Sequence, residues 1–386
     1  MSDSVIKSSS EMSCKICGIG NFESRNKLFK HFKTCGSEAD SGKIIPLIDL
    51  EHDISDKFIY VTGGRCRGRT LGSVERYSLL EKRWEGCPPM MENRGSHGAA
   101  AVHDLLYVFG GGGFRSNLAT CEMFDSRNQI WKAVAPLKTF RHALVVFSMK
   151  VTYDFFVNEQ KLITVTEAHH AHCASDNAMN LIFAIGGWYD GSVCSGDVEV
   201  YDHLTDSWVA CASLNVPRRL LGASPYKNQI YVFGGNCDDG VWFTAAVECY
   251  DFASNVWSKK RDLPFPGPTS AVTVGDYIYV LLHGKKMLRY CPASDTYTSL
   301  ANLPLKEWFC FDVTTFGYSI FVHGGVSQGD SSKAFYSYDV RTDVWVELPQ
   351  MLFPRRRCAA AIMVAGPLPL QSPVVKKARQ ESSSAL

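Results

Sequence analysis

The chain lacks the features of membrane-inserted and secreted proteins. Among its 386 residues there is no run of roughly 18 apolar residues and no apolar N-terminal signal segment. The formal net charge of +1 gives no strong reason to bind nucleic acid or an anionic membrane non-specifically. Without a signal peptide, the fourteen cysteines are expected to be reduced thiols. We therefore expect a protein of the cytoplasm or the nucleus that has no membrane partner.

Signatures of catalysis are also missing. There is no Glu-x3-Asp-x3-His metal run, no nucleophile–base pair and no pair of carboxylates at a useful spacing. The glycine run Gly110–Gly113 is not followed by a predicted helix, which argues against a phosphate-binding loop. We predict that the chain is not an enzyme. A metalloenzyme that uses the scattered histidines is the least favoured alternative.

A short pattern recurs along the chain with a period of about 50 residues. Each copy has an apolar run that ends in two glycines, then an aromatic residue, and a second aromatic seven positions later. The glycine pairs are Gly63-Gly64, Gly110-Gly111, Gly186-Gly187, Gly234-Gly235 and Gly324-Gly325, with His283-Gly284 in a degenerate fifth copy. The aromatic pairs are Tyr77/Trp84, Phe124/Trp131, Tyr201/Trp208, Tyr250/Trp257, Tyr290/Tyr297 and Tyr338/Trp345.

Each copy is interpreted as four strands. An arginine follows the tryptophan by ten residues in four copies and precedes a strand of small residues: Arg94, Arg141, Arg218 and Arg355. After the last arginine, the segment Cys358–Val364 has no glycine strand to follow it. It is expected to fill the empty innermost position of the first blade. The pattern predicts an all-β fold, a six-bladed propeller over residues 54–366.

These recurring marks resemble those of the kelch superfamily, over about four-fifths of the chain. The resemblance implies a non-enzymatic scaffold or substrate-recognition adaptor that binds a protein or peptide and serves ubiquitin ligation. The alternative is a kelch protein that binds actin. No BTB, BACK or F-box region precedes the ring in this sequence, so ligase subunits are expected to be recruited through the N-terminal segment or another subunit.

The loops after the glycine pairs carry large side chains that occur in one blade only. Arginine and aromatic residues are common anchors of protein contacts. The candidate partner-binding residues are Arg67, Arg69, Phe114, Arg115, Trp188, Tyr189, Asp190, Asp238, Asp239 and Trp242. The four repeated arginines either join this site or bond to backbone carbonyls of a neighbouring blade, and the sequence leaves both interpretations open. The recurring tryptophans are interpreted as core.

The N-terminal segment 14–35 has the spacing of a zinc finger with a small ββα fold. Its predicted ligands are Cys14, Cys17, His31 and Cys35, with Phe22 and Leu28 as its two core residues. So short a segment cannot bury enough apolar area to fold unaided, so zinc would supply the folding energy. The alternative is a disordered tail with chance cysteines. A protein contact is favoured over nucleic acid, because one finger reads only about three base pairs.

The remaining segments are predicted to lie outside regular structure. Residues 1–13 and 367–386 have disordered composition, and 36–53 form a linker. Residues 150–178 are an insertion, because Arg141 precedes its glycine pair by 45 residues whereas Arg94 and Arg218 precede theirs by 16. The insertion is either a true loop or an artefact of the gene model. In both cases its deletion is expected to preserve stability.

Overall fold

The computed structural model describes residues 57–113, 117–152, 178–189, 193–237, 243–284, 286–305 and 307–364. All of these ranges belong to one compact unit, Ile54–Leu386. Their regular structure consists of β-strands, and within them no helix is long and apolar enough to cross a bilayer. The predicted zinc finger, the linker and both tails fall outside the described residues.

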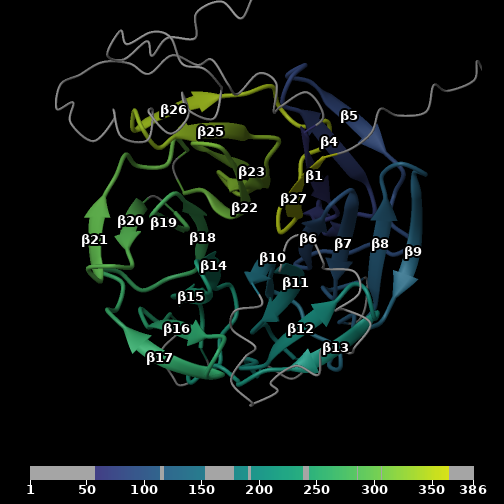
Figure 1. Ribbon diagram of the computed structural model, residues 1–386. Coiled ribbons are helices and arrows are strands. Elements are labelled where there is room, and N and C mark those ends of the chain that lie inside the picture. Colours follow the sequence, from purple (N-terminus) through teal and green to yellow (C-terminus); the bar gives the residue numbers. More distant parts are fainter. Residues whose placement is uncertain are drawn as a thin grey trace, which may run out of the picture. The chain divides into compact units, whose positions relative to one another are not determined.

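Six antiparallel sheets surround a central axis, which confirms the predicted six-bladed propeller (Figure 1). From the axis outward, blade 1 contains β27 (Ala359–Val364), β1 (Lys57–Thr62), β4 (Val74–Ser78) and β5 (Trp84–Cys87); blade 2 contains β6 (Gly98–Val102), β7 (Leu105–Phe109), β8 (Cys121–Asp125) and β9 (Ile130–Val134); blade 3 contains β10 (Val145–Thr152), β11 (Ala178–Ile185), β12 (Val198–Asp202) and β13 (Ser207–Ala210). Blade 4 contains β14 (Gly222–Tyr226), β15 (Gln229–Phe233), β16 (Val247–Asp251) and β17 (Val256–Lys260); blade 5 contains β18 (Thr269–Val274), β19 (Tyr277–Leu282), β20 (Lys286–Cys291) and β21 (Thr296–Ser299); blade 6 contains β22 (Phe309–Phe316), β23 (Ser319–Ser327), β25 (Phe335–Asp339) and β26 (Val344–Glu347).

Blade 1 is assembled from two distant parts of the chain. Strand β27 pairs with β1 in an antiparallel register that runs from Thr62↔Ala359 to Lys57↔Val364. Three short strands lie outside the four-strand pattern: β2 (Arg65–Cys66) pairs with β3 (Arg69–Thr70), and β24 (Asp330–Ser331) pairs with β23.

The glycine pairs are required by a backbone contact between blades. The second glycine donates its N–H to the carbonyl of the residue at the repeated arginine position in the next link, as in Gly111 N to Arg141 O at 3.0 Å. The first glycine has a positive φ, and a Cβ on Gly110 would lie 2.7 Å from that same carbonyl. Glycine is therefore required there by the positive φ and by the close approach of a backbone carbonyl.

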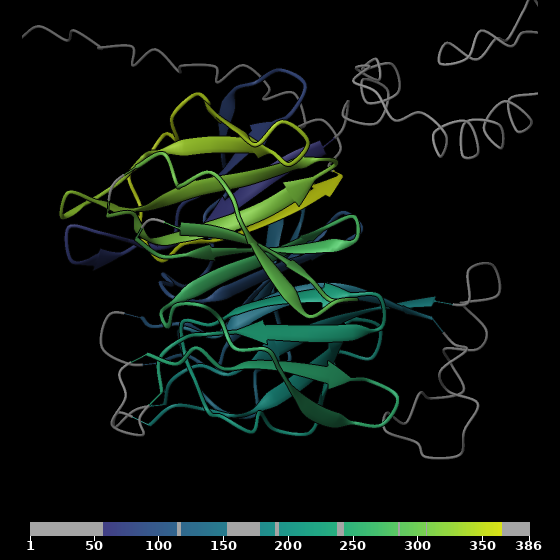
Figure 2. The same cartoon turned by 90° about the vertical axis from the view of Figure 1, so that its left-hand side faces the viewer.

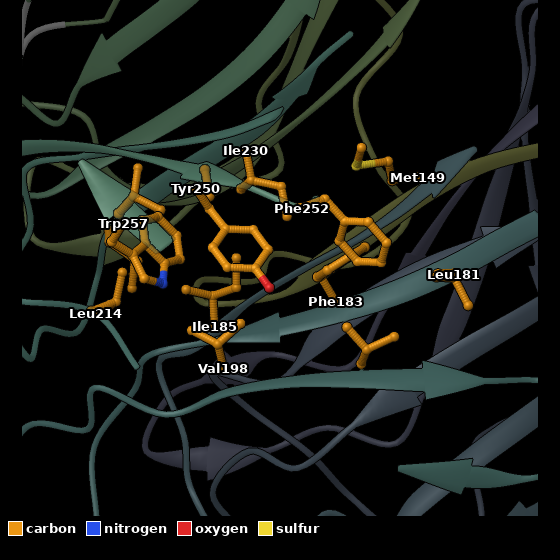
Figure 3. Packing of buried hydrophobic residues seen from close by; sticks show 14 of the residues in the cluster. Met149, Leu181, Phe183, Ile185, Val198, Leu214, Ile230, Tyr250, Phe252 and Trp257 are labelled. Atoms are coloured by element: carbon orange, nitrogen blue, oxygen red, sulfur yellow. The ribbon is translucent and has the colours of Figure 1, made fainter. Parts of the chain in front are cut away.

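The hydrophobic core lies between neighbouring blades (Figure 3). In the cluster between blades 3 and 4, Phe183 of β11 packs edge-on against Phe252 at 5.9 Å, and Tyr250 lies 5.0 Å from Trp257. The Trp257 indole N–H donates to Ala212 O in the preceding link, so this ring joins its outer strand to the blade before it. Four blades share this arrangement, with donors Trp84, Trp131, Trp208 and Trp257.

The tryptophans differ in burial. Trp208 and Trp257 are buried, whereas Trp84, Trp131 and Trp345 are only partly buried. The core interpretation therefore holds fully for two of the five. The other three lie at the outer strand, where one side of the ring still meets solvent.

The hairpin of blade 3 extends beyond the boundary predicted for the insertion. Strands β10 and β11 continue through the pairs Lys150↔Asn180, Val151↔Met179 and Thr152↔Ala178. Val151 is 1% exposed and belongs to the core cluster of blades 3 and 4. The predicted range 150–178 therefore includes residues of the ladder, and only 153–177 fall outside the described part of this hairpin.

Candidate protein-interaction face

Successive strands of a blade run in opposite directions, so two kinds of connection open on the same side of the ring. These are the loops between the second and third strands and the links from an outer strand to the next inner strand. We call this side the loop face; the turns between the other strands lie on the opposite face. Its described residues are 63–73, 110–113, 117–120, 186–189, 193–197, 234–237, 243–246, 283–284 and 328–334 in loops, and 88–97, 135–144, 211–221, 261–268, 300–305, 307–308 and 348–358 in links.

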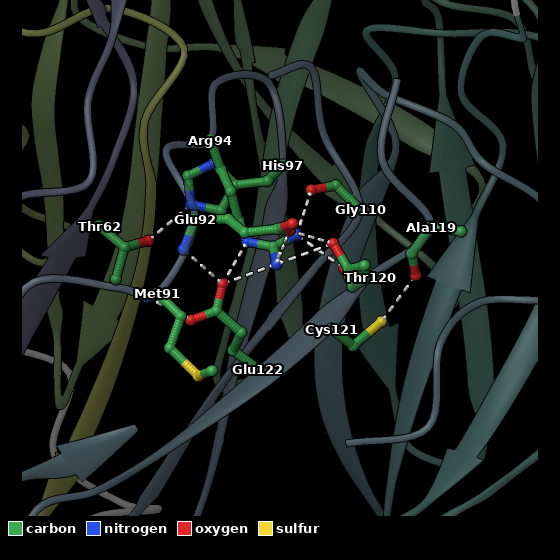
Figure 4. Close-up of polar contacts among 10 residues, drawn as sticks. All are labelled: Thr62, Met91, Glu92, Arg94, His97, Gly110, Ala119, Thr120, Cys121 and Glu122. Atoms are coloured by element: carbon green, nitrogen blue, oxygen red, sulfur yellow. Dashed lines mark hydrogen bonds and ion pairs between the residues drawn. The ribbon is translucent and has the colours of Figure 1, made fainter. Parts of the chain in front are cut away.

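The four repeated arginines lie buried below this face and join its links to its loops. Arg94 is fully buried and donates through Nε and Nη2 to Glu122 Oε1 at 3.0 and 2.7 Å, and through Nη1 to the carbonyls of Gly110 and Thr120 (Figure 4). Equivalent ion pairs join Arg141 to Glu199, Arg218 to Glu248 and Arg355 to Glu75.

The glutamates connect the same network to the incoming links. Glu122 accepts the N–H of Met91 at 2.6 Å, and Glu248 accepts that of Asn215 at 2.9 Å. Burial lowers the pKa of the Arg218 guanidinium, and the Glu248 carboxylate opposes that effect. The repeated arginines are therefore structural. They bond to carbonyls of the blade into which they lead, and they are not available to a partner.

Blades 5 and 6 replace this network with other residues. Trp308 precedes Gly324 by 16 residues, as Arg94 and Arg218 precede their glycine pairs, and it is fully buried. Its indole N–H donates to Gly324 O at 2.7 Å, and its ring lies 5.7 Å from Tyr336, which occupies the glutamate position. In blade 5 the equivalent positions hold Gly267 and Leu288. The 16-residue spacing would have revealed Trp308 from the sequence.

A ring of backbone hydrogen bonds encircles the mouth of the central channel. The residue two positions after each repeated arginine has a positive φ and bonds to its counterpart in the neighbouring blade, as in Ala143 N to Ser96 O at 2.7 Å and Leu220 N to Ala143 O at 3.1 Å. Between blades 5 and 6, Cys310 N donates to His283 Nδ1 at 3.3 Å instead. Burial lowers the pKa of His283 to about 4, so the neutral ring can accept this bond.

The channel below this ring holds a cavity of about 430 Å³ lined by the innermost strands. Small and hydroxyl-bearing residues such as Ala100, Ser224 and Thr273 line most of it. Its one described carboxyl is Asp312, which accepts the N–H of Ala360 at 2.7 Å. Burial raises the pKa of Asp312 to about 6.

Above the ring, a second set of backbone bridges joins each incoming link to the loop of its own blade. The bridged pairs are Arg356/Arg65 in blade 1, Gly95/Gly112 in blade 2, His142/Trp188 in blade 3, Arg219/Asn236 in blade 4 and Phe309/Val326 in blade 6. Equivalent backbone positions carry two arginines in blade 1, two glycines in blade 2, two aromatic rings in blade 3, an arginine and an asparagine in blade 4, and two apolar side chains in blade 6. The side chains of the loop face therefore differ from blade to blade, although its backbone repeats.

The predicted partner-binding residues fall into three groups. Arg67 and Arg69 lie exposed on the β2–β3 hairpin, which projects from the loop face at the left of Figure 2. Trp188 packs against His142 at 5.2 Å and beneath the Arg219 guanidinium at 3.5 Å. The Tyr189 hydroxyl bonds to Asp197 and lies 3.1 Å from Ser195 Oγ, so it also stabilises its own loop. Phe114, Arg115, Asp190, Asp238, Asp239 and Trp242 lie outside the described residues.

Four further arginines of this face were missed: Arg65, Arg219, Arg356 and Arg357. Three of them directly follow a repeated arginine or a glycine pair, so the recurring pattern hid them. As for metals, no three His, Cys, Asp or Glu side chains gather within the described ranges. The predicted zinc ligands Cys14, Cys17, His31 and Cys35 lie outside those ranges.

Comparison with family models identifies the repeats. A Kelch motif model matches residues 59–91, 93–138, 169–215 and 308–352, and a second Kelch motif model matches 217–264. Together these ranges cover more than half of the chain. The chain belongs to the kelch-repeat family. No matched range includes blade 5, in keeping with the absence of the arginine, the glutamate and the first glycine from that blade.

Curated kelch proteins resemble this chain at low identity. Mouse Kelch-like protein 35 is 26% identical over 75% of this chain and 45% of its own length. Human Kelch-like protein 38 is 23% identical over 83% and 52%, and zebrafish Kelch repeat and BTB domain-containing protein 8 is 27% identical over 66% and 36%. The kelch chain thus spans about half the length, or less, of these relatives.

Proposed function

We propose that this kelch propeller is a non-enzymatic protein-interaction module that binds a segment of a partner protein on its loop face. The proposal rests on the different positions of repeated and single-copy residues on that face. Residues that recur are buried in the Arg–Glu network, whereas residues found in one blade only lie at the backbone bridges between links and loops. Since the repeated side chains stabilise the fold, we assign recognition of a partner to the single-copy side chains.

Trp188 and Arg219 form the best anchor in the described part of this face. The guanidinium stacks on the indole ring at 3.5 Å, and the Arg219 Nε and Nη1 atoms have no hydrogen-bond partner among the described residues. Trp and Arg are the residue types that most often dominate the energy of protein contacts. Exposed apolar side chains on other links of the loop face, such as Phe140 and Phe353, would add contact area.

We further propose that the bound protein is a substrate and that the chain acts as an adaptor in ubiquitin ligation. Support comes from its similarity to kelch-like proteins, one of which is named for a BTB domain in addition to its kelch repeats. The Kelch motif models match the propeller only, so the ligase contact would come from another segment or subunit. Zinc bound by Cys14, Cys17, His31 and Cys35, and a location in the cytoplasm or nucleus, remain part of this proposal.

Affinity purification with mass spectrometry tests the proposal when two variants are compared. Trp188→Ala removes the anchor on the loop face, whereas Leu204→Ala removes an exposed side chain from a turn of the same blade on the opposite face. We expect the first variant to lose a partner that the second retains. Ligase subunits among the retained proteins would support the adaptor role, and actin would instead favour the cytoskeletal alternative. Equal recovery by both variants would contradict binding at this face.

A further inference from the structure

Five arginines gather on the loop face of blade 1. Arg65, Arg67 and Arg69 lie on the projecting hairpin, and Arg356 and Arg357 lie on the link that enters the blade. Arg65 and Arg356 each donate a backbone N–H to the other's carbonyl, at 2.8 and 3.0 Å, and Arg357 lines the channel mouth. None of the five forms an ion pair with a carboxylate of the described residues, whereas each repeated arginine has a glutamate.

The Arg65 side chain lies across the bridge between Gly95 and Gly112 in blade 2. A Cβ on Gly95 would stand 2.8 Å from Arg65 Cγ, and one on Gly112 would stand 2.8 Å from Arg65 Nη2. Neither glycine has a positive φ, so backbone conformation does not demand glycine there. Both positions instead leave room for the arginine, which is thereby held in place before any ligand arrives.

This placement leaves a charged group under-satisfied. Arg65 Nε is buried without a hydrogen-bond partner among the described residues, which is costly for a charged donor. Burial, followed by the positive charges of Arg357 and Arg356, lowers the pKa of Arg65. An anion at the mouth of blade 1 would relieve both the missing bond and the mutual repulsion.

A phosphate monoester suits this cluster better than a single carboxylate. It carries about −1.5 to −2 charges near neutral pH and three acceptor oxygens, against one charge and two oxygens for a carboxylate. Guanidinium forks bond to phosphate oxygens in pairs, and clustered arginines are a recurring means of binding phosphorylated segments. The neighbouring Arg67 and Arg69 are exposed on the same hairpin and extend the positive field outward.

We propose that Arg65, Arg356 and Arg357 bind a phosphorylated serine or threonine of the partner segment. The proposal rests on the protein-interaction function above and specifies the form in which the partner is recognised. The partner would be bound after phosphorylation and ignored before it, so a kinase would control its recognition by this propeller.

The test uses the full chain and three immobilised degenerate peptide libraries that differ only in their central residue: phosphoserine, serine or aspartate. We expect the phosphoserine library to bind at least about tenfold more tightly than the other two. The double variant Arg65→Gln/Arg357→Gln should bind it no better than the serine library. Arg83→Gln, which removes one positive charge from an exposed turn of blade 1 on the opposite face, should leave binding unchanged.

A third variant separates position from charge. Gly112→Ala keeps every arginine but places a methyl group 2.8 Å from Arg65 Nη2, which displaces that group. Phosphopeptide affinity should therefore fall about tenfold at unchanged net charge. Melting temperatures of all variants check that the ring still folds.

Three outcomes would overturn the assignment: equal binding to the aspartate library, full binding by the double variant, or binding only to phosphoinositide-containing phosphatidylcholine vesicles. If partner capture depends on Trp188 but survives phosphatase treatment of the partner, the phosphate inference fails while the protein-interaction function stands.

Discussion

Two sets of arginines on one face of this propeller differ in how their charges are satisfied. Arg94, Arg141, Arg218 and Arg355 are fully buried, and each is paired with a glutamate of its own blade. Arg356 and Arg357 directly follow Arg355, and Arg65 directly follows the glycine pair of blade 1. None of these three has such a partner in the described part of the molecule. The side chain is the same, so its role depends on whether the third strand supplies a carboxylate within reach.

The comparison extends to whole blades. Blade 5 has no buried Arg–Glu pair, and at its boundary with blade 6 an imidazole replaces one backbone acceptor of the channel-mouth ring. Blade 6 uses a buried tryptophan and a tyrosine in the same positions. The propeller therefore tolerates different chemistry at one repeated position.

The largest expected effect comes from breaking one buried pair. Glu248→Ala leaves the Arg218 guanidinium buried without its carboxylate, and the N–H groups of Asn215 and Val216 lose their acceptor. We expect a loss of about 3–5 kcal/mol in the free energy of unfolding. Denaturant titration would measure it. The double variant Arg218→Met/Glu248→Leu should lose much less, and an equal loss in both would show that packing matters there and charge does not.

The next largest effect is expected at the tryptophans, whose contribution to stability should follow their burial. Trp257→Ala empties a buried site in the core of blades 3 and 4 and should cost about 3–5 kcal/mol. Trp131→Ala removes a partly buried ring at the equivalent position of blade 2 and should cost less. Thermal melts of both variants would rank them. A larger loss at Trp131 would contradict the difference in burial.

Buried histidines give the fold a dependence on pH. His97 is 4% exposed, its Nε2 lies 2.8 Å from Thr62 Oγ1, and burial lowers its pKa to about 3. The unfolded chain takes up this proton below its ordinary pKa of about 6.5, so the contribution is complete above that value and is lost as the pH falls toward 3. Between pH 7 and pH 5 the loss from His97 should be roughly 2 kcal/mol.

Asp312 acts in the opposite direction over part of this range. Its pKa is raised to about 6, so the fold gains stability when this carboxyl is protonated. Comparing the wild type with His97→Gln at both pH values isolates the histidine, because Asp312 is common to the two. A wild type and variant with the same pH dependence would show that His97 does not contribute.

The predicted insertion in blade 3 includes residues that pair in the β10–β11 ladder and residues that lie outside the described part of the chain. Replacing 153–177 by an Asp-Gly turn between Thr152 and Ala178 should leave stability within about 1 kcal/mol, since loop-closure entropy changes little. Deleting the whole of 150–178 also removes Val151 from the core and should cost about 1–2 kcal/mol more. Melting temperatures of the two deletions would show whether the extra ladder pairs contribute. Equal values would show that they do not.

The smallest effect on stability is expected at the exposed hairpin. Arg67→Ala and Arg69→Ala remove exposed side chains that form no ion pair with the described residues, so each should change stability by less than about 0.5 kcal/mol. A lowered melting temperature of either variant would show that these arginines stabilise the fold, as the repeated arginines do.

Much of the ring was predictable because its signals are local and repeated. The glycine pairs, the aromatic spacing and the strand runs all recur in phase, so the number of blades followed from the sequence. The site was harder to predict. Arg67, Arg69, Trp188 and Tyr189 were recognised as single-copy residues, but Arg65 and Arg219 were not, because residues next to a repeated motif look like part of it.

The sequence alone therefore determined the period, the six blades and the residues that recur, because strand periodicity and turn chemistry act over short stretches of chain. Only the tertiary structure decided which arginines are paired. Arg94 and Glu122 are 28 residues apart, and Arg355 and Glu75 lie near opposite ends of the propeller's sequence. Whether a guanidinium meets a carboxylate, or lies across two glycines of the next blade as Arg65 does, depends on how the sheets pack around the axis.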